Sequence, residues 1–111
     1  MITFNDKTYT SSTEIFFEIF SDKWKLFILW LLLAQPRRFK ELSKTLGITE
    51  KTLSLKLKEL EALYLVEREV FAEVPLRVEY SLSAHGKTLK PLFEEILHWS
   101  QDYAKEFGAL S

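Results

Sequence analysis

Two segments with helical spacing of apolar residues occupy the middle of the chain, between positions 38 and 64. They flank a short turn that contains Gly47, and a turn of this kind typically joins two crossed helices. Thr49 is a candidate N-cap for the second helix, which is expected over residues 50–64. The pattern therefore predicts a helix-turn-helix. Its second helix should bury one apolar stripe, formed by Leu53, Leu57, Leu60 and Tyr64.

The opposite face of this second helix is basic and polar. A helix that lies in the major groove of DNA presents such side chains to phosphates and base edges. Lysines on a surface helix can also be no more than solvated charge, so both interpretations stay open at this point. The candidate DNA contacts on and beside this helix are Thr49, Lys51, Thr52, Leu55, Lys56 and Lys58.

Charge is distributed unevenly along the chain. The whole sequence has 15 basic and 16 acidic residues, a net charge of −1, which by itself argues against a nucleic-acid-binding protein. Residues 37–58, however, hold seven basic and two acidic residues, a local net charge of +5. Such a local patch is expected of a protein that touches DNA with one face. It adds Arg37, Arg38 and Lys40 to the candidate DNA contacts.

Two short runs of strand-forming residues follow the second helix, at 66–71 and 77–82. They predict a β-hairpin within residues 65–82. The link between the two strands is longer than a tight turn, and it contains Pro75, which cannot donate a hydrogen bond to a strand ladder. The tip of the hairpin is therefore expected to project as a loop, in the manner of a wing.

Arg77 stands at the base of this predicted wing. A guanidinium suits both the negative potential of a narrow minor groove and the oxygens of a phosphate. Residues 72–77 are therefore a candidate contact near the minor groove or the DNA backbone. The alternative is that Arg77 pairs with Glu73 or Glu79 on the protein surface, and the sequence does not decide between the two.

Residues 11–34 predict two further helices, preceded by a polar stretch, residues 1–10, that is expected to be a loose arm. Ser11 and Glu14 form a possible capping box for the first of these helices. The second contains nine consecutive apolar residues, 26–34, a run too short to span a bilayer. A fully buried central helix is the expected structure of that run.

The last predicted element is one long helix over residues 83–107, with Ser83 as its N-cap. At 1.5 Å per residue it would be on the order of 36 Å long. Pro91 removes one backbone donor inside this span and is expected to kink it. A single core built from 111 residues cannot cover a helix of that length.

The terminal helices therefore carry more apolar surface than one chain can bury, and this predicts a homodimer. The alternative is that the aromatic side chains fold back on their own subunit. In a dimer, the two recognition helices can lie about one helical turn apart, roughly 34 Å, as a palindromic operator requires. The predicted dimer interface consists of Ile15, Phe16, Ile19, Phe20, Ile96, Trp99, Tyr103 and Phe107.

Several segments together resemble the HxlR-type winged-helix transcriptional regulators, which are related to the MarR regulators. The resemblance implies one domain over residues 1–111, mainly α with a small β-hairpin, that has dimerisation helices at both ends. It also implies sequence-specific binding to double-stranded DNA, with one helix and one wing per subunit on each half of a palindromic operator. By the same resemblance, Ser54 joins its neighbours on the recognition helix, residues 50–64, as a candidate DNA contact. The segments are DKWKLFILWLL at 22–32, QPRRFKEL at 35–42, GITEKTLSLKLKELEALYLVER at 47–68, VPLRVEYSLSAHG at 74–86, and the later Trp99.

The chain departs from the family pattern at three places. Family members usually carry a cysteine near the start of the first helix, where this chain has Ser11. Since the chain contains no cysteine, thiol-based sensing is excluded. Ser21 and Asp22 replace two common glycines. Tyr64 replaces the glycine that commonly ends the recognition helix, so this end is either strained or built differently.

Enzymatic chemistry is not expected. His85 and His98 are the only histidines, and they have no metal-ligand set or phosphate-binding glycine loop beside them. No metal or cofactor is therefore predicted, and the absence of a targeting segment favours the cytoplasm over the membrane. The alternative function is a winged-helix module that binds protein. A small-molecule effector is a further possibility, with ordinary dimer core as its alternative, and its candidate pocket residues are Phe16, Phe20, Trp24 and Trp99.

Overall fold

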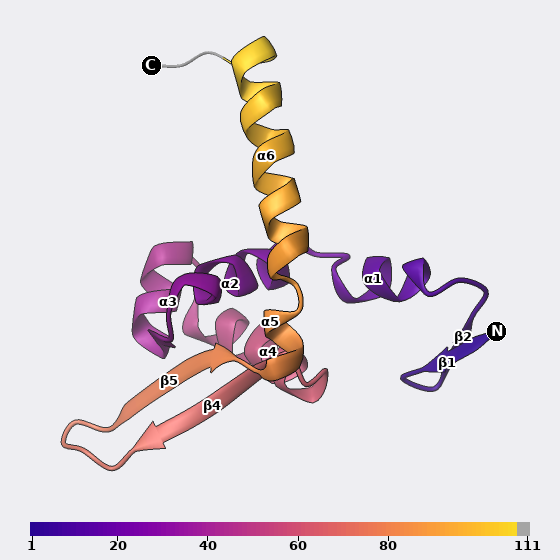
Figure 1. Ribbon diagram of the computed structural model, residues 1–111. Coiled ribbons are helices and arrows are strands. Elements are labelled where there is room, and N and C mark those ends of the chain that lie inside the picture. Colours follow the sequence, from indigo (N-terminus) through magenta and orange to yellow (C-terminus); the bar gives the residue numbers. More distant parts are fainter. Residues whose placement is uncertain (109–111) are drawn as a thin grey trace.

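The computed structural model describes residues 1–108, and it is mainly helical with two small antiparallel sheets (Figure 1). The predicted fold class is therefore confirmed. The elements in chain order are β1 Ile2–Phe4, β2 Lys7–Tyr9, α1 Thr13–Ile19, α2 Lys23–Ala34, β3 Arg37–Arg38, α3 Phe39–Leu46, α4 Glu50–Ala62, β4 Val66–Phe71, β5 Arg77–Leu82, α5 Ala84–Lys87 and α6 Lys90–Phe107.

The core lies where α2, α3 and α4 meet the three-stranded sheet. The apolar stripe predicted for the second helix is confirmed at three positions of α4, because Leu53, Leu57 and Leu60 are fully buried. The other fully buried large side chains are Ile28, Leu29 and Leu42, from α2 and α3. The sheet closes this core from below in the view of Figure 1, through Val66, Tyr80 and Leu82.

The predicted stripe is wrong at its last member, because α4 ends at Ala62 and Tyr64 is 75% exposed. Tyr64 has a φ of 61°, in the left-handed region. This conformation lets the N–H of Leu65 donate to the carbonyl of Leu60 at 3.1 Å, which closes the helix end. The strained terminus expected from the missing glycine is therefore present.

Tyr64→Gly is expected to raise the free energy of unfolding by about 1 kcal/mol. A side chain in the left-handed region costs roughly this amount, which glycine avoids, and the exposed ring of Tyr64 contributes little packing. Urea denaturation measures the change. Ala62→Gly is the matched control: Ala62 is the last residue of α4 and has no positive φ to relieve, so the same residue there should not raise the stability. A Tyr64→Gly protein no more stable than the wild type would contradict the assignment of strain.

The predicted hairpin is confirmed as β4 and β5, which pair antiparallel from Val66 opposite Leu82 to Phe71 opposite Arg77. The sequence did not reveal the third strand of this sheet. β3 is only two residues long, and it pairs with β5 through Arg37 opposite Tyr80 and Arg38 opposite Glu79. A strand of two residues is too short to show an alternating pattern of apolar and polar positions, so the sequence gives no signal for it.

The expected full burial of the apolar run in α2 is wrong on one face. Ile28, Leu29 and Leu32 are buried, whereas Phe27 is 49% and Trp30 39% exposed. A continuous apolar run looks the same in the sequence whether one side or both sides of the helix are covered. In this chain one side of α2 faces the core, and the other faces the base of α6.

The expected loose arm is also wrong, because residues 2–9 form the hairpin of β1 and β2. Asn5 and Asp6 both have positive φ values, 49° and 62°, as the two central residues of a tight hairpin turn require. The capping box of α1 is present in part. Glu14 accepts the backbone N–H groups of Thr10 and Ser11 at 2.8 and 3.2 Å.

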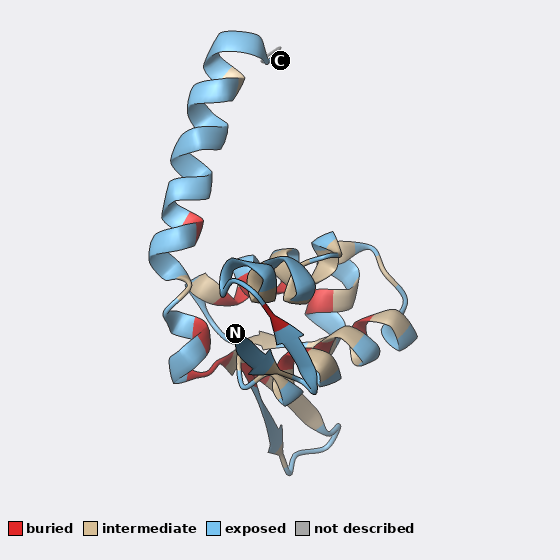
Figure 2. Ribbon diagram, turned by 90° about the vertical axis from the view of Figure 1, so that its right-hand side faces the viewer, coloured by how far each residue is buried: buried red, intermediate tan, exposed pale blue. Residues whose placement is uncertain are grey.

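The long C-terminal helix is interrupted, so the expectation of one kinked helix over residues 83–107 is a further error. Ser83 caps only the short α5, whose Gly86 N–H it accepts at 3.0 Å. A turn at Thr88 and Leu89 follows, and α6 then begins at Lys90 with Pro91 in its first turn. A proline in the first turn lacks a donor that would be unpaired there in any case, so α6 has no kink at this position. Most of α6 projects beyond the domain and is exposed (Figure 2).

Candidate nucleic-acid interface

The turn between α3 and α4 sets the direction of α4, the predicted recognition helix. Gly47 ends α3 with a φ of 68°, and its N–H donates to the carbonyl of Ser43 at 2.9 Å. Thr49 then caps α4, as predicted, because its Oγ1 accepts the N–H of Thr52 at 3.1 Å. Thr49 and Thr52 therefore help to shape the start of the helix, in addition to lying where DNA contacts are predicted.

The outward face of α4 combines basic and apolar side chains. Lys51, Leu55 and Lys58 lie opposite the buried stripe and are exposed, while Thr52 and Ser54 flank them and are half-buried. In a helix that lies in the major groove, lysines contact phosphates and an exposed apolar side chain can contact a thymine methyl group, so this combination suits DNA binding. These five predicted residues share one accessible surface.

Lys56 differs from its neighbours because it is held by a carboxylate. Its Nζ lies 3.0 Å from Oδ2 of Asp22, and the nearby Lys25 and Glu59 form a second ion pair between α2 and α4 at 2.7 Å. The other carboxylate oxygen of Asp22 accepts the N–H of Trp24 at 2.9 Å and so caps α2. Lys56 therefore ties the recognition helix to the start of α2, a role that its spacing in the sequence did not reveal.

The contact between Asp22 and Lys56 shifts the pKa of both groups. Burial disfavours ionisation of Asp22, but the hydrogen bond from Lys56 and those from the backbone outweigh it, so the pKa of Asp22 is lowered. The hydrogen bond to Asp22 raises the pKa of Lys56. Both residues are therefore charged near neutral pH.

Asp22→Asn is expected to lower the free energy of unfolding by about 0.5–1 kcal/mol at pH 7, the value of a solvent-screened pair. Asparagine caps a helix as well as aspartate does, so the variant loses only the charge that holds Lys56. A lowered carboxyl pKa stabilises the fold above about pH 4 and is lost on acidification, and a raised lysine pKa stabilises it below about pH 10. Urea denaturation at pH 7 and near pH 3 should show the difference between variant and wild type shrinking at the lower pH. A difference of equal size at both pH values would contradict this.

The three basic residues before α4 have different surroundings. Arg37 is half-buried, and its Nε donates to the carbonyl of Leu31 at 3.3 Å, which fastens β3 to α2. Arg38 and Lys40 are exposed at the start of α3. Of the three predicted contacts, Arg38 and Lys40 are therefore accessible to a ligand, while Arg37 is held against α2.

The wing carries more negative than positive charge. Between Val66 and Leu82 there are four glutamates and two arginines. Arg77 forms ion pairs with both Glu73, at 3.0 Å, and Glu79. Its guanidinium also lies 3.7 Å from the ring centre of Phe71, and its carboxylate partners raise its pKa. The surface-pairing alternative for Arg77 is thus the one that the structure shows.

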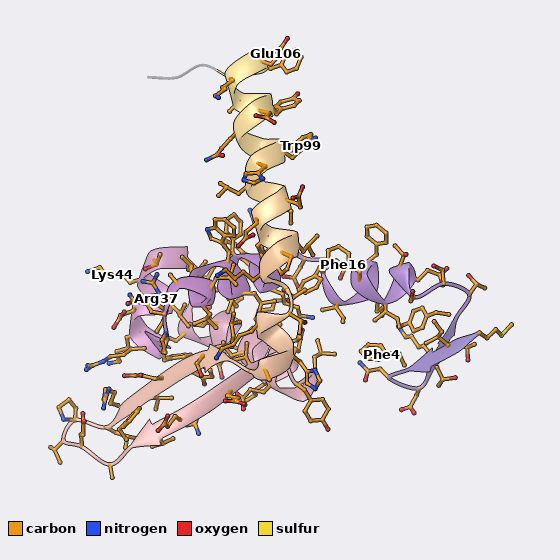
Figure 3. The ribbon with its side chains drawn as sticks, in the orientation of Figure 1. Phe4, Phe16, Arg37, Lys44, Trp99 and Glu106 are labelled. Atoms are coloured by element: carbon orange, nitrogen blue, oxygen red, sulfur yellow. The ribbon has the colours of Figure 1, made fainter. Side chains whose placement is uncertain are left out.

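The predicted dimer residues lie on α1 and α6, except Phe20, which follows the end of α1 and packs against the core. Trp99, Tyr103 and Phe107 are 66%, 53% and 71% exposed and stack in one row, with ring centres about 5 Å apart. They do not fold back on their own chain. Trp99 lies on the side of α6 toward which α1 extends (Figure 3). Ile15, Phe16 and Ile19 of α1, and Phe20 after it, are half-buried, and the exposed Phe17 adds to their surface.

An apolar groove of about 380 Å³ lies between α2 and the base of α6. It includes Ile96 from the predicted dimer residues, but it shares no residue with the predicted effector pocket. Phe16 contacts Phe20 and Trp24 contacts Phe27, with ring centres 4.9 and 6.1 Å apart. The residues that line the groove are Lys23, Leu26, Phe27, Trp30, Phe93, Ile96, Leu97 and Ser100.

Crossed helices α3 and α4, followed by a hairpin that projects beside them, define a winged helix-turn-helix domain, a class that binds DNA through its second helix. The exposed lysines of α4 fit this class. The chain belongs to the HxlR-like helix-turn-helix family, whose sequence model matches residues 19–107. The resemblance seen in the sequence is therefore confirmed.

Similar proteins are transcriptional regulators. BH0655 of Halalkalibacterium halodurans, an HTH-type transcriptional regulator, is 53% identical over 79 residues, which cover 69% of this chain and 70% of that protein. The crystal structure of the HTH-type transcriptional regulator YtcD has a TM-score of 0.79 at 34% identity, covering 86% of this chain and 99% of that one. Quinone-bound YodB from Bacillus subtilis has a TM-score of 0.68 at 33% identity, covering 81% and 96%.

The family and these relatives are transcriptional regulators and not enzymes, which confirms that part of the sequence interpretation. Within residues 1–108, no helix is both long enough and apolar enough to cross a membrane.

Proposed function

We propose that this chain is a homodimeric transcriptional regulator of the cytoplasm that binds a palindromic DNA operator. The recognition helix α4 enters the major groove, and the wing tip, residues 72–77, lies near the minor groove or the backbone. The observation that carries the proposal is the exposed row of Lys51, Leu55 and Lys58 on the helix that this fold presents to DNA. Arg38 and Lys40 extend the same positive surface.

The dimer is supported by the aromatic row on α6. Trp99, Tyr103 and Phe107 form an exposed apolar strip well beyond the domain, and a monomer gains nothing from holding such a strip in water. A second copy that supplies the same strip would cover it through a two-fold interface. Two recognition helices would then be held at a fixed separation, as two operator half-sites require.

Selection of bound sequences from a random duplex library tests the proposal. Enrichment of inverted half-sites with a constant spacing is expected. The Lys51→Gln/Lys58→Gln variant should bind the selected duplex more weakly, and the slope of log affinity against log salt should fall by about two, since each lost phosphate contact removes about 0.9. Equal affinity for every duplex would contradict specific regulation and would favour a module that binds protein.

We further propose a small apolar effector that binds without a covalent bond, since YodB has been captured with a quinone and this chain has no cysteine to attack one. The groove between α2 and α6 has the size and apolar lining of a small-molecule site. A thermal shift assay with aromatic and quinone-like compounds tests this. A higher melting temperature that Trp30→Ala abolishes is expected, and no stabilisation by any compound would contradict the proposal.

A further inference from the structure

A second groove, of about 420 Å³, runs between the recognition helix and the wing. It adjoins the outward row of α4 and shares Lys58 with that row. Ser54, Lys58 and Glu61 come from α4, and Phe39 comes from α3. The opposite wall comes from the hairpin and consists of Arg68, Val78 and Tyr80.

Arg68 faces this groove because of the strand register. It pairs with Tyr80 across the hairpin and alternates with the buried Val66, so it lies on the side of the sheet that packs against the helices. Arg77 lies on the other side, together with Glu79. The two arginines of the wing therefore point in opposite directions.

Arg68 is also available to a ligand, unlike Arg77. It is exposed, and among residues 1–108 no carboxylate forms an ion pair with it. Tyr80, its partner across the hairpin, is buried and lines the same groove. Burial raises the pKa of Tyr80, and the Arg68 guanidinium opposes that rise. The cation is thus held beside an aromatic wall and is open to solvent.

Lys58 brings a second positive charge to the groove from the helix side. Glu61 is the one carboxylate among the lining residues, so the groove keeps a net charge of +1. Two cations on opposite walls, with the Ser54 hydroxyl beside them, match the oxygens of one phosphodiester group. The position between recognition helix and wing is where the DNA backbone passes when the helix occupies the major groove.

We propose that this α4–wing groove binds one backbone phosphate of duplex DNA, held by Arg68 from the wing and by Lys58 from the recognition helix. The inference rests on the proposed DNA-binding function. It assigns the electrostatic contact of the wing to the inner face of β4, because the outer face is acidic and its Arg77 is already paired. Arg68 positions the duplex without reading its sequence.

The test measures duplex affinity by fluorescence polarisation as a function of salt. Arg68→Gln should weaken binding about tenfold at 0.15 M salt, equally for the selected and a scrambled duplex, and should lower the salt slope by about one. Arg68→Lys should restore the slope. Glu61→Gln should strengthen binding, because it removes the charge that repels the phosphate.

Lys87→Gln is the matched control. It removes one positive charge from an exposed site on the other side of the sheet, beside Glu67 and Ser81, and should change the affinity less than twofold. Melting temperatures of all variants show whether each one is folded. An unchanged salt slope in folded Arg68→Gln, while the wild type binds its selected duplex, would overturn the groove assignment alone. A wild type that binds no duplex would overturn the proposed function together with it.

Discussion

Tyr103→Glu is expected to convert the protein from a dimer to a monomer and to weaken binding to a duplex with two half-sites by about 100-fold or more. The new carboxylate would lie at the centre of the aromatic row, between Trp99 and Phe107, where a dimer would bury it without a partner. A dimer binds its second half-site intramolecularly, and the loss of that linkage typically costs a factor of 10² to 10⁴. Sedimentation velocity and fluorescence polarisation measure the two effects.

Gln101→Glu provides the control for this prediction. Gln101 is exposed, lies on the opposite side of α6, and would receive the same charge. That variant should remain dimeric and should bind DNA as the wild type does. Binding to a duplex with a single half-site should change little in either variant, because α4 is far from the substitution. A Tyr103→Glu protein that remains dimeric would contradict the predicted interface.

Gly86→Ala is expected to lower the free energy of unfolding by about 2–3 kcal/mol, and the melting temperature by about 10 °C. A methyl group at this position would lie 2.2 Å from the carbonyl oxygen of Leu65, which is backbone and cannot rotate away. The same carbonyl accepts the N–H of Ser83, at 3.0 Å, so a shift would also disturb the cap of α5. Chemical denaturation gives the stability, and near-UV circular dichroism reports on the packing.

The neighbouring His85→Ala separates this clash from an effect on the helix. His85 is exposed in the first turn of α5, so removal of its side chain should change the stability by less than about 0.5 kcal/mol. A Gly86→Ala protein with the same melting temperature as the wild type would show that α5 can move away from Leu65 without loss of stability. That outcome would contradict the close packing described here.

Elements whose physical causes are local could be predicted from the sequence. The stripe from Leu53 to Leu60 follows from helical spacing, and the caps at Thr49 and Ser83 follow from hydroxyl groups placed just before helices. The wing follows from alternation interrupted by Pro75. Each of these signals lies within a few residues of the feature that it predicts.

Features that depend on distant partners were missed or misjudged. β3 forms by pairing with β5, and one face of α2 stays partly exposed beside the base of α6, which projects away from the domain (Figure 1). The N-terminal hairpin and the break before Pro91 had local signals, in Asn5 and Asp6 and in the preference of proline for a first turn. The N-terminal stretch was judged by its polar composition alone, which does not reveal the turn at Asn5 and Asp6.

The candidate site shows the same division. Helical spacing placed Lys56 on the DNA surface, but its carboxylate partner lies 34 positions away, so this pairing depends on the fold. For Arg77 the sequence left open a DNA contact or pairing with Glu73 or Glu79, and the structure shows the pairing. Arg68 went unnoticed in a strand with two glutamates, although alternation with the buried Val66 already places it on the inner face. For the prediction of DNA contacts, the face on which each charged side chain lies is therefore more informative than the net charge of the segment.

The short turn between α5 and α6 has a geometric consequence for any dimer built on α6. An 18-residue helix is about 27 Å long, so a change of about 10° at Thr88 and Leu89 moves its far end by about 5 Å. One base pair rises by about 3.4 Å, so this small rotation exceeds the step between neighbouring bases. In such a dimer, the backbone angles of Thr88 and Leu89 would set the spacing between the two recognition helices, and substitutions there would alter the preferred number of base pairs between half-sites without touching DNA.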